Sequence, residues 1–243
     1  MSNLVTIGEM LMDFREPIDC KETNLYSASV GGSPANVSVQ AAKLGTSSSF
    51  IGKVGNDHFG KLMKKTLSEY GVSTENLILD SKFLTALAFV NIQDRRRQFT
   101  FYRKNCADTQ LQFSEVDTSV IDDCKIFHFG SISLTDEPSK STTIKAVEYA
   151  KNSGKIISYD PNWRPNLWAS KGEAIEIMQC LLEKVDIIKV SEDELQMLTD
   201  CDKLVRGISK LLEFGIKIVV VTQGAKGCIV AGNGEIACMP TYD

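Results

Sequence analysis

The stretch Gly-Gly-Ser-Pro-Ala-Asn at residues 31–36 decides the fold of the N-terminal part of the chain. Ser33 is of a type that caps helices and proline is favoured at a first helical position, so we expect a helix from Pro34 that stops at Gly45. The glycine pair leaves bare backbone at the positive end of this helix, which suits a polyhydroxylated or anionic small molecule. The stretch is equally typical of a loop that merely turns into a helix.

Outward from this helix, apolar strands alternate with helices along the whole sequence. We expect strands at residues 4–13, 49–54, 85–92, 97–103, 125–134, 155–160, 186–190 and 216–222, with a last hairpin at 228–239. We expect further helices at residues 57–70, 136–152, 170–183, 203–214 and directly after 191. This alternation builds a mostly parallel sheet with helices on both faces, and the near-continuous apolar run at 216–221 fits a sheet covered on both sides. The sequence therefore predicts an α/β fold.

The two strands at 85–92 and 97–103 differ from the rest. Phe99 and Phe101 alternate with Thr100 and Tyr102, which is the two-residue period of a half-exposed sheet. We interpret this hairpin as a small lid.

Composition narrows the class of protein. The length of 243 residues fits one α/β domain or one domain with a small appendage, and the net charge of −4 argues against a nucleic-acid partner. The basic run at 95–97 falls in an expected turn, and the longest apolar run, 218–221, is too short to span a membrane. Glu9 and Asp13 interrupt any leader-like pattern, and seven scattered cysteines fit reduced thiols, so we expect a cytoplasmic protein without a zinc or disulfide framework.

Polar residues recur where expected strands end, and ligands of open α/β sheets bind at that edge. Each group also has a purely structural interpretation as a turn, and Ser191 with Glu194 is typical of a helix capping box. The residues are Asp13, Asp160, Asn162, Arg164, Ser191, Glu194, Thr222, Gly224 and Gly227.

One pattern is rejected. Gly55, Gly60 and Lys61 nearly spell a phosphate-binding P-loop, but Leu62 stands where a hydroxyl must hold magnesium. No Ser-His-Asp set and no closely spaced carboxylate pair suggests hydrolysis.

Eight segments in order carry a family resemblance. They are GGSPANVSVQAAKLG (31–45), FIGKVGNDHFG (50–60), TALAFVNI (85–92), FTFYR (99–103) with AD at 107–108, FHFGSISL (127–134), SYDPNWR (158–164), IIKVSEDEL (187–195) and VVVTQGAKG (219–227). Together they closely resemble the ribokinase-like, phosphofructokinase-B type sugar kinases, and among these the fructokinases. The resemblance covers residues 1–243 and implies a three-layer α/β/α sandwich with a mostly parallel sheet. It also implies a small β-sheet lid with strands at about 15–30 and 84–104.

The resemblance implies a site that binds the sugar and the phosphate group transferred to it. Asp13 matches the carboxylate that accepts sugar hydroxyls, and Arg164 matches a guanidinium near the transferred phosphate, where it stabilises charge. The remaining implied sugar-binding residues are Gly31, Gly32, Asn36, Phe89, Phe101, Arg103 and Asn162.

It further implies a nucleotide site for ATP and Mg²⁺, with a monovalent cation such as K⁺ as a further expectation. Ser191 and Glu194 match an Asn-x-x-Glu element, in which Ser replaces Asn and Glu194 acts on magnesium through water. The other residues that match this site are Lys189, Thr222, Gly224 and Gly227.

The family's catalytic element, Gly-Ala-Gly-Asp at a helix start, does not occur in these 243 residues. It supplies the anion hole and the general base, each of which contributes on the order of a hundredfold or more to the rate. We therefore expect a single domain that is truncated at its C-terminus, binds sugar better than it phosphorylates it, and exposes apolar surface.

The leading hypothesis is an ATP-dependent kinase that converts D-fructose to fructose 6-phosphate. A 2-dehydro-3-deoxygluconate kinase is the nearest alternative, since Tyr102 or Arg103 in FTFYR could face a substrate carboxylate. A catalytically impaired sugar-binding or regulatory protein, and an unstable fragment, are the others. We expect small-molecule sugar and ATP as partners, no nucleic acid, no membrane, and a possible homodimer through the lid.

Overall fold

The computed structural model describes residues 2–16, 25–93 and 96–241. Ten strands form one large sheet in the order β14-β13-β12-β11-β10-β9-β1-β4-β5, and β6 pairs with β4 beside this path. The six neighbours β12, β11, β10, β9, β1 and β4 run parallel, whereas β13 and β14 form an antiparallel hairpin at one end. The predicted α/β class with a mostly parallel sheet is confirmed.

The strand boundaries follow the predicted alternation. The main sheet contains β1 (Leu4–Ile7), β4 (Ser48–Gly55), β5 (Val72–Ser73), β6 (Leu77–Asp80), β9 (Ile126–Gly130), β10 (Ile156–Asp160), β11 (Ile187–Ser191), β12 (Ile218–Thr222), β13 (Cys228–Gly232) and β14 (Glu235–Met239). The short strands β5 and β6 were not predicted, and β9 ends at Gly130 rather than at 134. The chain then makes a 3-10 turn, Ile132–Leu134, which belongs to the edge where parallel strands end.

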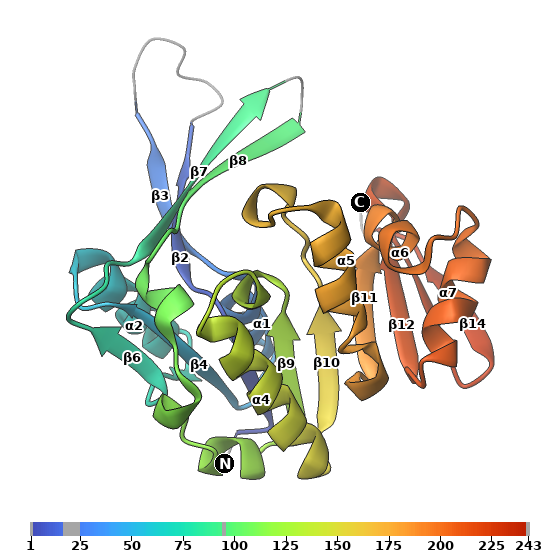
Figure 1. The fold of residues 1–243 in the computed structure, drawn as a ribbon, viewed down its shortest axis with the longest axis horizontal. Coiled ribbons are helices and arrows are strands. Elements are labelled where there is room, and N and C mark those ends of the chain that lie inside the picture. The colour runs from blue at the N-terminus through green and yellow to red at the C-terminus, as the bar shows by residue number, and fades with distance from the viewer. Residues whose placement is uncertain (1, 17–24, 94–95, 242–243) are drawn as a thin grey trace.

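Helices lie on both faces of this sheet, as Figure 1 shows. The α-helices are α1 (Ser33–Lys43), α2 (His58–Glu69), α3 (Ser119–Asp122), α4 (Ser139–Asn152), α5 (Lys171–Gln179), α6 (Glu192–Thr199) and α7 (Leu204–Glu213). Strand residues alternate between the layers: Ile7 packs in the core with α4, whereas the Thr6 hydroxyl bonds the Ser38 hydroxyl of α1 at 2.8 Å. This is the expected three-layer sandwich.

Sequence signals set most helix ends. Asp57 caps α2 through the Gly60 amide at 2.9 Å, and Ser191 caps α6 in a complete capping box with Glu194. Glycines with positive φ follow four of the helices, at the predicted stop Gly45 and at Gly71, Gly154 and Gly215. The prediction for α1 is wrong by one residue, because Ser33 is already helical and Gly32 stands at the N-cap without a side-chain cap of its own.

A second sheet of four strands rises from the main sheet at the left of Figure 1. Its order is β3-β2-β7-β8, from β2 (Leu11–Arg15), β3 (Ser27–Gly31), β7 (Ala86–Gln93) and β8 (Arg96–Tyr102). We call this sheet the lid. The predicted single strand at 4–13 is wrong, because the chain leaves the main sheet after Ile7 and enters the lid at Leu11. The turn expected at 94–95, the side chains of the basic run 95–97 and residues 17–24 of the segment 15–30 lie outside the described residues.

One region of the main sheet is covered on a single face. In β10, β11 and β12 the alternate residues that face α4 to α7 are buried, such as Tyr159, Val190 and Val221. Residues on the opposite face are half-exposed, and Ile156 and Ile218 are 42% and 37% exposed. Apolar surface is therefore accessible over these three strands.

Two smaller findings bear on the predicted class. The six cysteines in the described part of the chain are free thiols, whereas Cys20 falls in the segment that is not described. Among the described residues, no helix combines the length and the apolar character needed to cross a membrane.

Candidate active site

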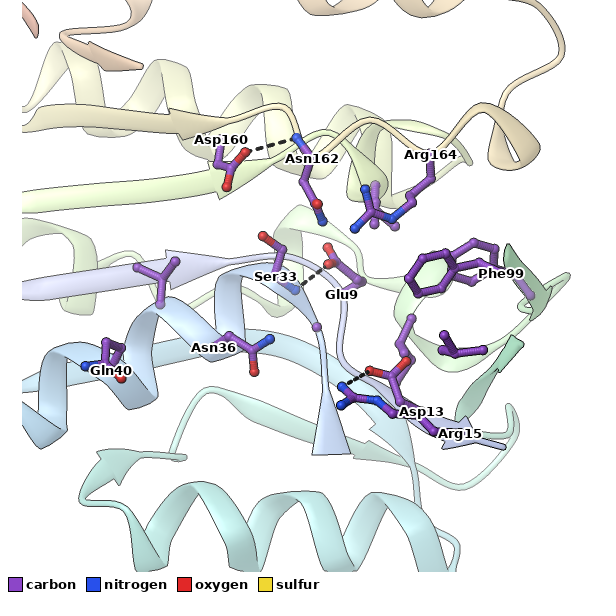
Figure 2. A pocket seen from close by; sticks show the side chains of 16 residues that line it. Glu9, Asp13, Arg15, Ser33, Asn36, Gln40, Phe99, Asp160, Asn162 and Arg164 are labelled. Atoms are coloured by element: carbon purple, nitrogen blue, oxygen red, sulfur yellow. Dashed lines mark hydrogen bonds and ion pairs between the residues drawn. The ribbon is translucent and has the colours of Figure 1, made fainter. Parts of the chain in front are cut away.

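A cavity of about 430 Å³ opens between the lid, the start of α1 and the end of β10 (Figure 2). It is lined by Glu9, Leu11, Asp13, Arg15, Gly32, Ser33, Asn36, Val37, Gln40, Val90, Phe99, Phe101, Ile132, Asp160, Asn162 and Arg164. Acidic and basic side chains face one another across it, with Asp13 and Arg15 on the lid side and Asp160 and Arg164 on the sheet side. We call this cavity the sugar pocket, after the ligand that the resemblance implies for it. Its volume lies in the range of small-molecule sites.

The glycine pair forms the floor of the pocket. Gly32 has φ +122°, and a Cβ atom placed there would come within 2.4 Å of the Glu9 carbonyl oxygen. A Cβ on Gly31 would come within 2.5 Å of Asp13 Oδ2. Gly32 therefore requires glycine, because its φ is positive and a Cβ would meet backbone, whereas a larger residue at position 31 would have to displace the Asp13 carboxylate. Asn36, one turn into α1, points into the same space.

Asp13 is positioned by the lid sheet. Strand β2 pairs with β7 in parallel, with Asp13 opposite Ala88, so that the Asp13 carboxylate lies on the pocket face. Burial raises the pKa of Asp13 above its ordinary value, although Arg15 and then Arg164 lower it. Arg15 stands 3.8 Å away and is largely exposed. A half-buried carboxylate with open lone pairs is suited to accept hydrogen bonds from hydroxyl groups.

Glu9 is a pocket residue that the sequence analysis did not select. It follows β1, its side chain is 1% exposed, and its Oε1 accepts the Ser33 amide at 2.8 Å. Burial raises the pKa of Glu9 to about 7, against the lowering effect of the Ser33 amide and of Arg103. The only signal in the sequence is a lone acid between two apolar strands, and that pattern does not show which way the side chain turns.

The register of the lid places two predicted aromatic residues on opposite faces. Phe99 and Phe101 line the pocket and stack with ring centroids 5.8 Å apart. Phe89 lies on the other face, where it stacks on Phe14 at 5.0 Å and meets Tyr102 at 5.5 Å. Phe89, which was predicted to cover or orient the sugar, therefore does not line the pocket, because successive residues of a strand point to opposite faces. Phe99, which the sequence analysis did not select as a sugar-binding residue, lines the pocket.

Arg103 was predicted as a sugar-binding residue and does not line the pocket. Its guanidinium is 3% exposed and pairs with Asp108 and, at 2.9 Å, with Asp136. It also donates to the Thr135 hydroxyl at 2.6 Å and to the Ile132 carbonyl at 3.1 Å. Arg103 thus joins the end of β8 to the β9–α4 connection, and its charge is paired with carboxylates of the protein itself.

The end of β10 brings polar groups to the opposite wall. Asn162 has φ +45°, and its backbone N–H donates to Asp160 Oδ1 at 3.1 Å, which closes a tight turn. Arg164 follows, with its guanidinium 5.1 Å above the Phe99 ring. This cation–π contact links the sheet side of the pocket to the lid. Arg164 also presents several donors to the cavity, which suits phosphate oxygens.

The predicted nucleotide residues lie outside this cavity, at the ends of the next two strands. Lys189 Nζ pairs with Asp160 at 3.2 Å, and this pair connects β11 with the pocket wall. Glu194 uses both carboxylate oxygens: Oε2 accepts the Ser191 amide at 2.8 Å and Oε1 accepts the Trp163 amide at 2.7 Å. The capping-box interpretation is therefore correct. A second role for Glu194 toward magnesium stays a prediction.

Thr222, Gly224 and Gly227 form a tight turn after β12. Ser191 pairs with Thr222 in register, and the Thr222 hydroxyl donates to the Val190 carbonyl at 3.3 Å. Gly227 has φ +96°, and a Cβ there would lie 2.0 Å from the Met239 carbonyl oxygen. Gly224 has φ +57° with open space around it. The turn thus exposes backbone at the same edge of the sheet as the sugar pocket.

Binding of Mg²⁺ stays a prediction for this part of the protein. Within the described residues, no group of three or more His, Cys, Asp or Glu side chains could enclose a metal ion. Magnesium commonly keeps several waters and is held by one or two carboxylates together with substrate phosphates. The carboxylates nearest to the proposed phosphates are Asp160, at the end of β10, and Glu194, in the first turn of α6.

The rejected P-loop is rejected by the structure as well. Gly55 ends β4, and α2 already begins at His58, so Gly60 and Lys61 are inside the helix rather than in a phosphate-binding loop. A Cβ on Gly60 would lie 1.9 Å from the Gly55 carbonyl oxygen, which explains this glycine by close packing.

Comparison with known proteins defines the class. The pattern of the pfkB family of carbohydrate kinases matches residues 1–242. A probable fructokinase-4 from Arabidopsis thaliana is 41% identical over 232 residues, which are 93% of this chain and 71% of that protein. The chain therefore belongs to the pfkB family and is a carbohydrate kinase.

Solved structures give the same class. The fructokinase from Xylella fastidiosa superposes with a TM-score of 0.90 at 29% identity, covering all of this chain and 77% of the other. The fructokinase from Vibrio cholerae with fructose, ADP and calcium superposes at 0.88 with 33% identity, over 98% of this chain and 76% of the other. A double mutant of that enzyme holds fructose, ADP and potassium.

Proposed function

We propose that this carbohydrate kinase transfers the γ-phosphate of ATP to D-fructose and forms fructose 6-phosphate. The observation that supports this best is the sugar pocket, where Asp13 and Asn36 oppose Arg164 across one small cavity. The named fructokinases among its relatives support the choice of fructose.

In this proposal the sugar lies on the glycine pair, under the lid. Asp13 accepts hydrogen bonds from sugar hydroxyls, Asn36 both donates and accepts, and Phe101 covers the apolar face of the sugar. Arg164 stabilises the charge on the phosphoryl group as it moves toward the hydroxyl. Phosphoryl transfer depends mainly on such positioning and charge neutralisation.

The nucleotide is proposed to lie along the ends of β11 and β12, with its phosphates directed to Lys189 and Arg164. The turn at Gly224 and Gly227 admits it close to backbone. Bound Mg²⁺ would neutralise phosphate charge there, near Asp160 and Glu194. A monovalent cation such as K⁺ remains a prediction, motivated by the potassium in the Vibrio cholerae structure.

The wall of the pocket favours a neutral sugar over 2-dehydro-3-deoxygluconate. The two residues proposed to meet a substrate carboxylate are engaged or directed elsewhere. Arg103 is buried against Asp108 and Asp136, and Tyr102 packs beside Phe89 on the outer face of the lid.

Binding is the first readout, because it reports directly on the sugar pocket. A sugar-binding protein with impaired catalysis is the second candidate function. Both functions predict fructose binding, and only the kinase predicts ADP release. Pairing of two copies through the lid stays a prediction, consistent with the exposure of Tyr26 and Tyr102 on its outer face.

The test compares wild type with Asp13→Asn. We expect calorimetry to show fructose binding to wild type and, since a charge-assisted acceptor is lost, binding at least about tenfold weaker to the variant. Release of ADP from ATP in the presence of fructose, with less ADP released in the presence of 2-dehydro-3-deoxygluconate, would support the kinase function. Fructose binding without ADP release would favour the second candidate.

Glu75→Gln is the matched control, because Glu75 is exposed and does not line the pocket. Equal fructose binding by wild type and Asp13→Asn would contradict the proposed site. Preference for the keto acid would contradict the proposed substrate.

A further inference from the structure

Glu9 has a position that its neighbours in the sugar pocket do not share. It is almost wholly buried, and one carboxyl oxygen, Oε1, receives the Ser33 amide at 2.8 Å. The other oxygen, Oε2, has no hydrogen-bond partner among the described residues. Figure 2 shows the Glu9 carboxyl group at the centre of the pocket, between Ser33 and Arg164.

Glu9 provides what the start of α1 lacks. Gly32 is the N-cap and has no side chain, so the first amides of α1 receive no cap from their own turn. The Glu9 carboxyl takes the Ser33 amide from a separate element, and the Glu9 carbonyl fills the space beside Gly32. A single residue thus fixes both the glycine pair and the first turn of the helix.

Charged groups from several elements face Glu9. Arg103, at the base of the lid, favours the ionised carboxyl, whereas Asp108 opposes it. Across the pocket lie Asp13 of β2 and Asp160 of β10, both acidic, and the basic residues of the lining are Arg15 and Arg164. The Glu9 carboxyl therefore stands between the floor of the pocket and the buried cluster that anchors the lid.

We propose that Glu9 is a positioning residue of the sugar pocket: its ionised carboxyl holds the glycine pair and the start of α1 in the conformation that binds sugar. The inference rests on the proposed function, since it assumes that the ligand of this pocket is a sugar. Glu9 acts through Ser33 and Gly32 and takes no part in phosphoryl transfer.

Ionisation strengthens this anchor, because a carboxylate accepts an amide hydrogen bond more strongly than a neutral acid does and also interacts with the helix dipole. Since burial raises the pKa of Glu9 to about 7, the anchor weakens as the pH falls through neutrality. We expect wild type to bind fructose about fivefold more weakly at pH 6 than at pH 8.

The variant Glu9→Gln separates charge from shape. Its amide oxygen can still accept the Ser33 amide, but it carries no charge and does not titrate. We expect Glu9→Gln to bind fructose with the weak affinity of wild type at pH 6, and to show no such step between pH 6 and pH 8. Glu75→Gln should follow wild type at every pH, because Glu75 is exposed.

Two measurements decide the inference. Calorimetry gives fructose affinity across the pH range for wild type, Glu9→Gln and Glu75→Gln. Nuclear magnetic resonance follows the Ser33 amide shift of the sugar-free protein, which should titrate near neutrality in wild type and in Glu75→Gln but not in Glu9→Gln. This second readout is independent of the substrate.

The outcomes separate the two proposals. If fructose binds to wild type but its affinity has the same pH dependence in Glu9→Gln, or if the Ser33 amide does not titrate in wild type, the role of Glu9 is overturned. If Ser33 titrates through Glu9 while fructose does not bind at any pH, the proposed substrate is wrong and the anchor remains. If Glu9→Gln does not fold, the wild-type Ser33 titration and fructose affinity must show the same midpoint, and different midpoints overturn the role.

Discussion

At the scale of single residues, the pocket places two carboxyl groups in different environments. Asp13 is half-buried beside Arg15, whereas Glu9 is almost wholly buried with one free oxygen. Burial raises the pKa of both, and for Glu9 to about 7. Asp13 remains able to meet a ligand, and Glu9 is committed to the protein. This division of roles follows from solvent access, since both residues are simple acids in the sequence.

The raised pKa of Glu9 makes folding stability depend on pH. The folded protein binds the Glu9 proton more tightly than the unfolded chain, so Glu9 costs stability progressively as the pH rises from about 4.5 to 7. We expect Glu9→Gln to gain stability relative to wild type over this range, by up to about 3 kcal/mol at pH 8. Denaturant unfolding of both proteins at pH 5 and pH 8 measures the difference. If the free energy of unfolding of Glu9→Gln differs from that of wild type by the same amount at pH 5 and at pH 8, the prediction is contradicted.

At the scale of elements, α1 depends on contacts that lie outside its own sequence. Its first turn is fixed by Gly32 in a positive-φ conformation, by the Pro34 ring and by the carboxyl of Glu9. The ring of Pro34 in turn packs against Gly8, where a Cβ would lie 2.7 Å from it. The helix, the β1–β2 connection and the glycine pair are therefore one structural unit, which forms the floor of the sugar pocket.

Gly32→Ala tests this unit. The alanine would have an unfavourable φ of +122° and a Cβ 2.4 Å from the Glu9 carbonyl oxygen, so we expect a loss of about 2–4 kcal/mol in the free energy of unfolding. Gly45→Ala is the matched control, because Gly45 has φ +85° with nothing within 4 Å, and should lose only about 1 kcal/mol. Urea unfolding measures both. Equal losses in the two variants would show that the close approach to Glu9 is unimportant.

At the scale of the whole molecule, the carboxyl edge of the main sheet is divided between two sites. The sugar pocket involves the ends of β1 and β10 together with the lid, and the proposed nucleotide site involves the ends of β11 and β12. The ion pair of Asp160 with Lys189 lies between them. Because parallel strands end at one edge, groups far apart in the sequence come into reach of one substrate pair.

This division predicts selective effects on ligand binding. Gly227→Ala would place a Cβ 2.0 Å from the Met239 carbonyl oxygen and displace the turn after β12. We expect ATP affinity to fall by about tenfold or more and fructose affinity to change by less than about twofold, since the altered turn does not line the sugar pocket. Gly234→Ala, with φ +78° and open space, is the control. Calorimetry with each ligand separately provides the test, and an equal loss of both affinities would disagree with two separate sites.

Much of the architecture was predictable because its causes are local. The capping box at Ser191, the Asp57 cap and the glycines that end α1, α2, α4 and α7 are short-range signals, and the structure contains all of them. The apolar runs predicted the parallel strands for the same reason, since a sheet covered by helices demands them. The predicted ends of helices and strands differ from the observed ends by a few residues where the sequence contains no such signal.

The lid and the pocket required the tertiary structure. The face of the lid on which a residue lies depends on the register between strands that are distant in the chain. Phe101 pairs with Ala88, so Phe89, the next residue of β7, lies on the opposite face from Phe101. The partners of Arg103 come from the β9–α4 connection and from Asp108, and burial alone distinguishes Glu9 from Asp13. The sequence by itself determined the order and type of the elements, because capping, periodicity and chain stops act between near neighbours. Only the tertiary structure decided which side chains meet a ligand, because strand register, burial and charge pairing depend on residues that are distant in the chain.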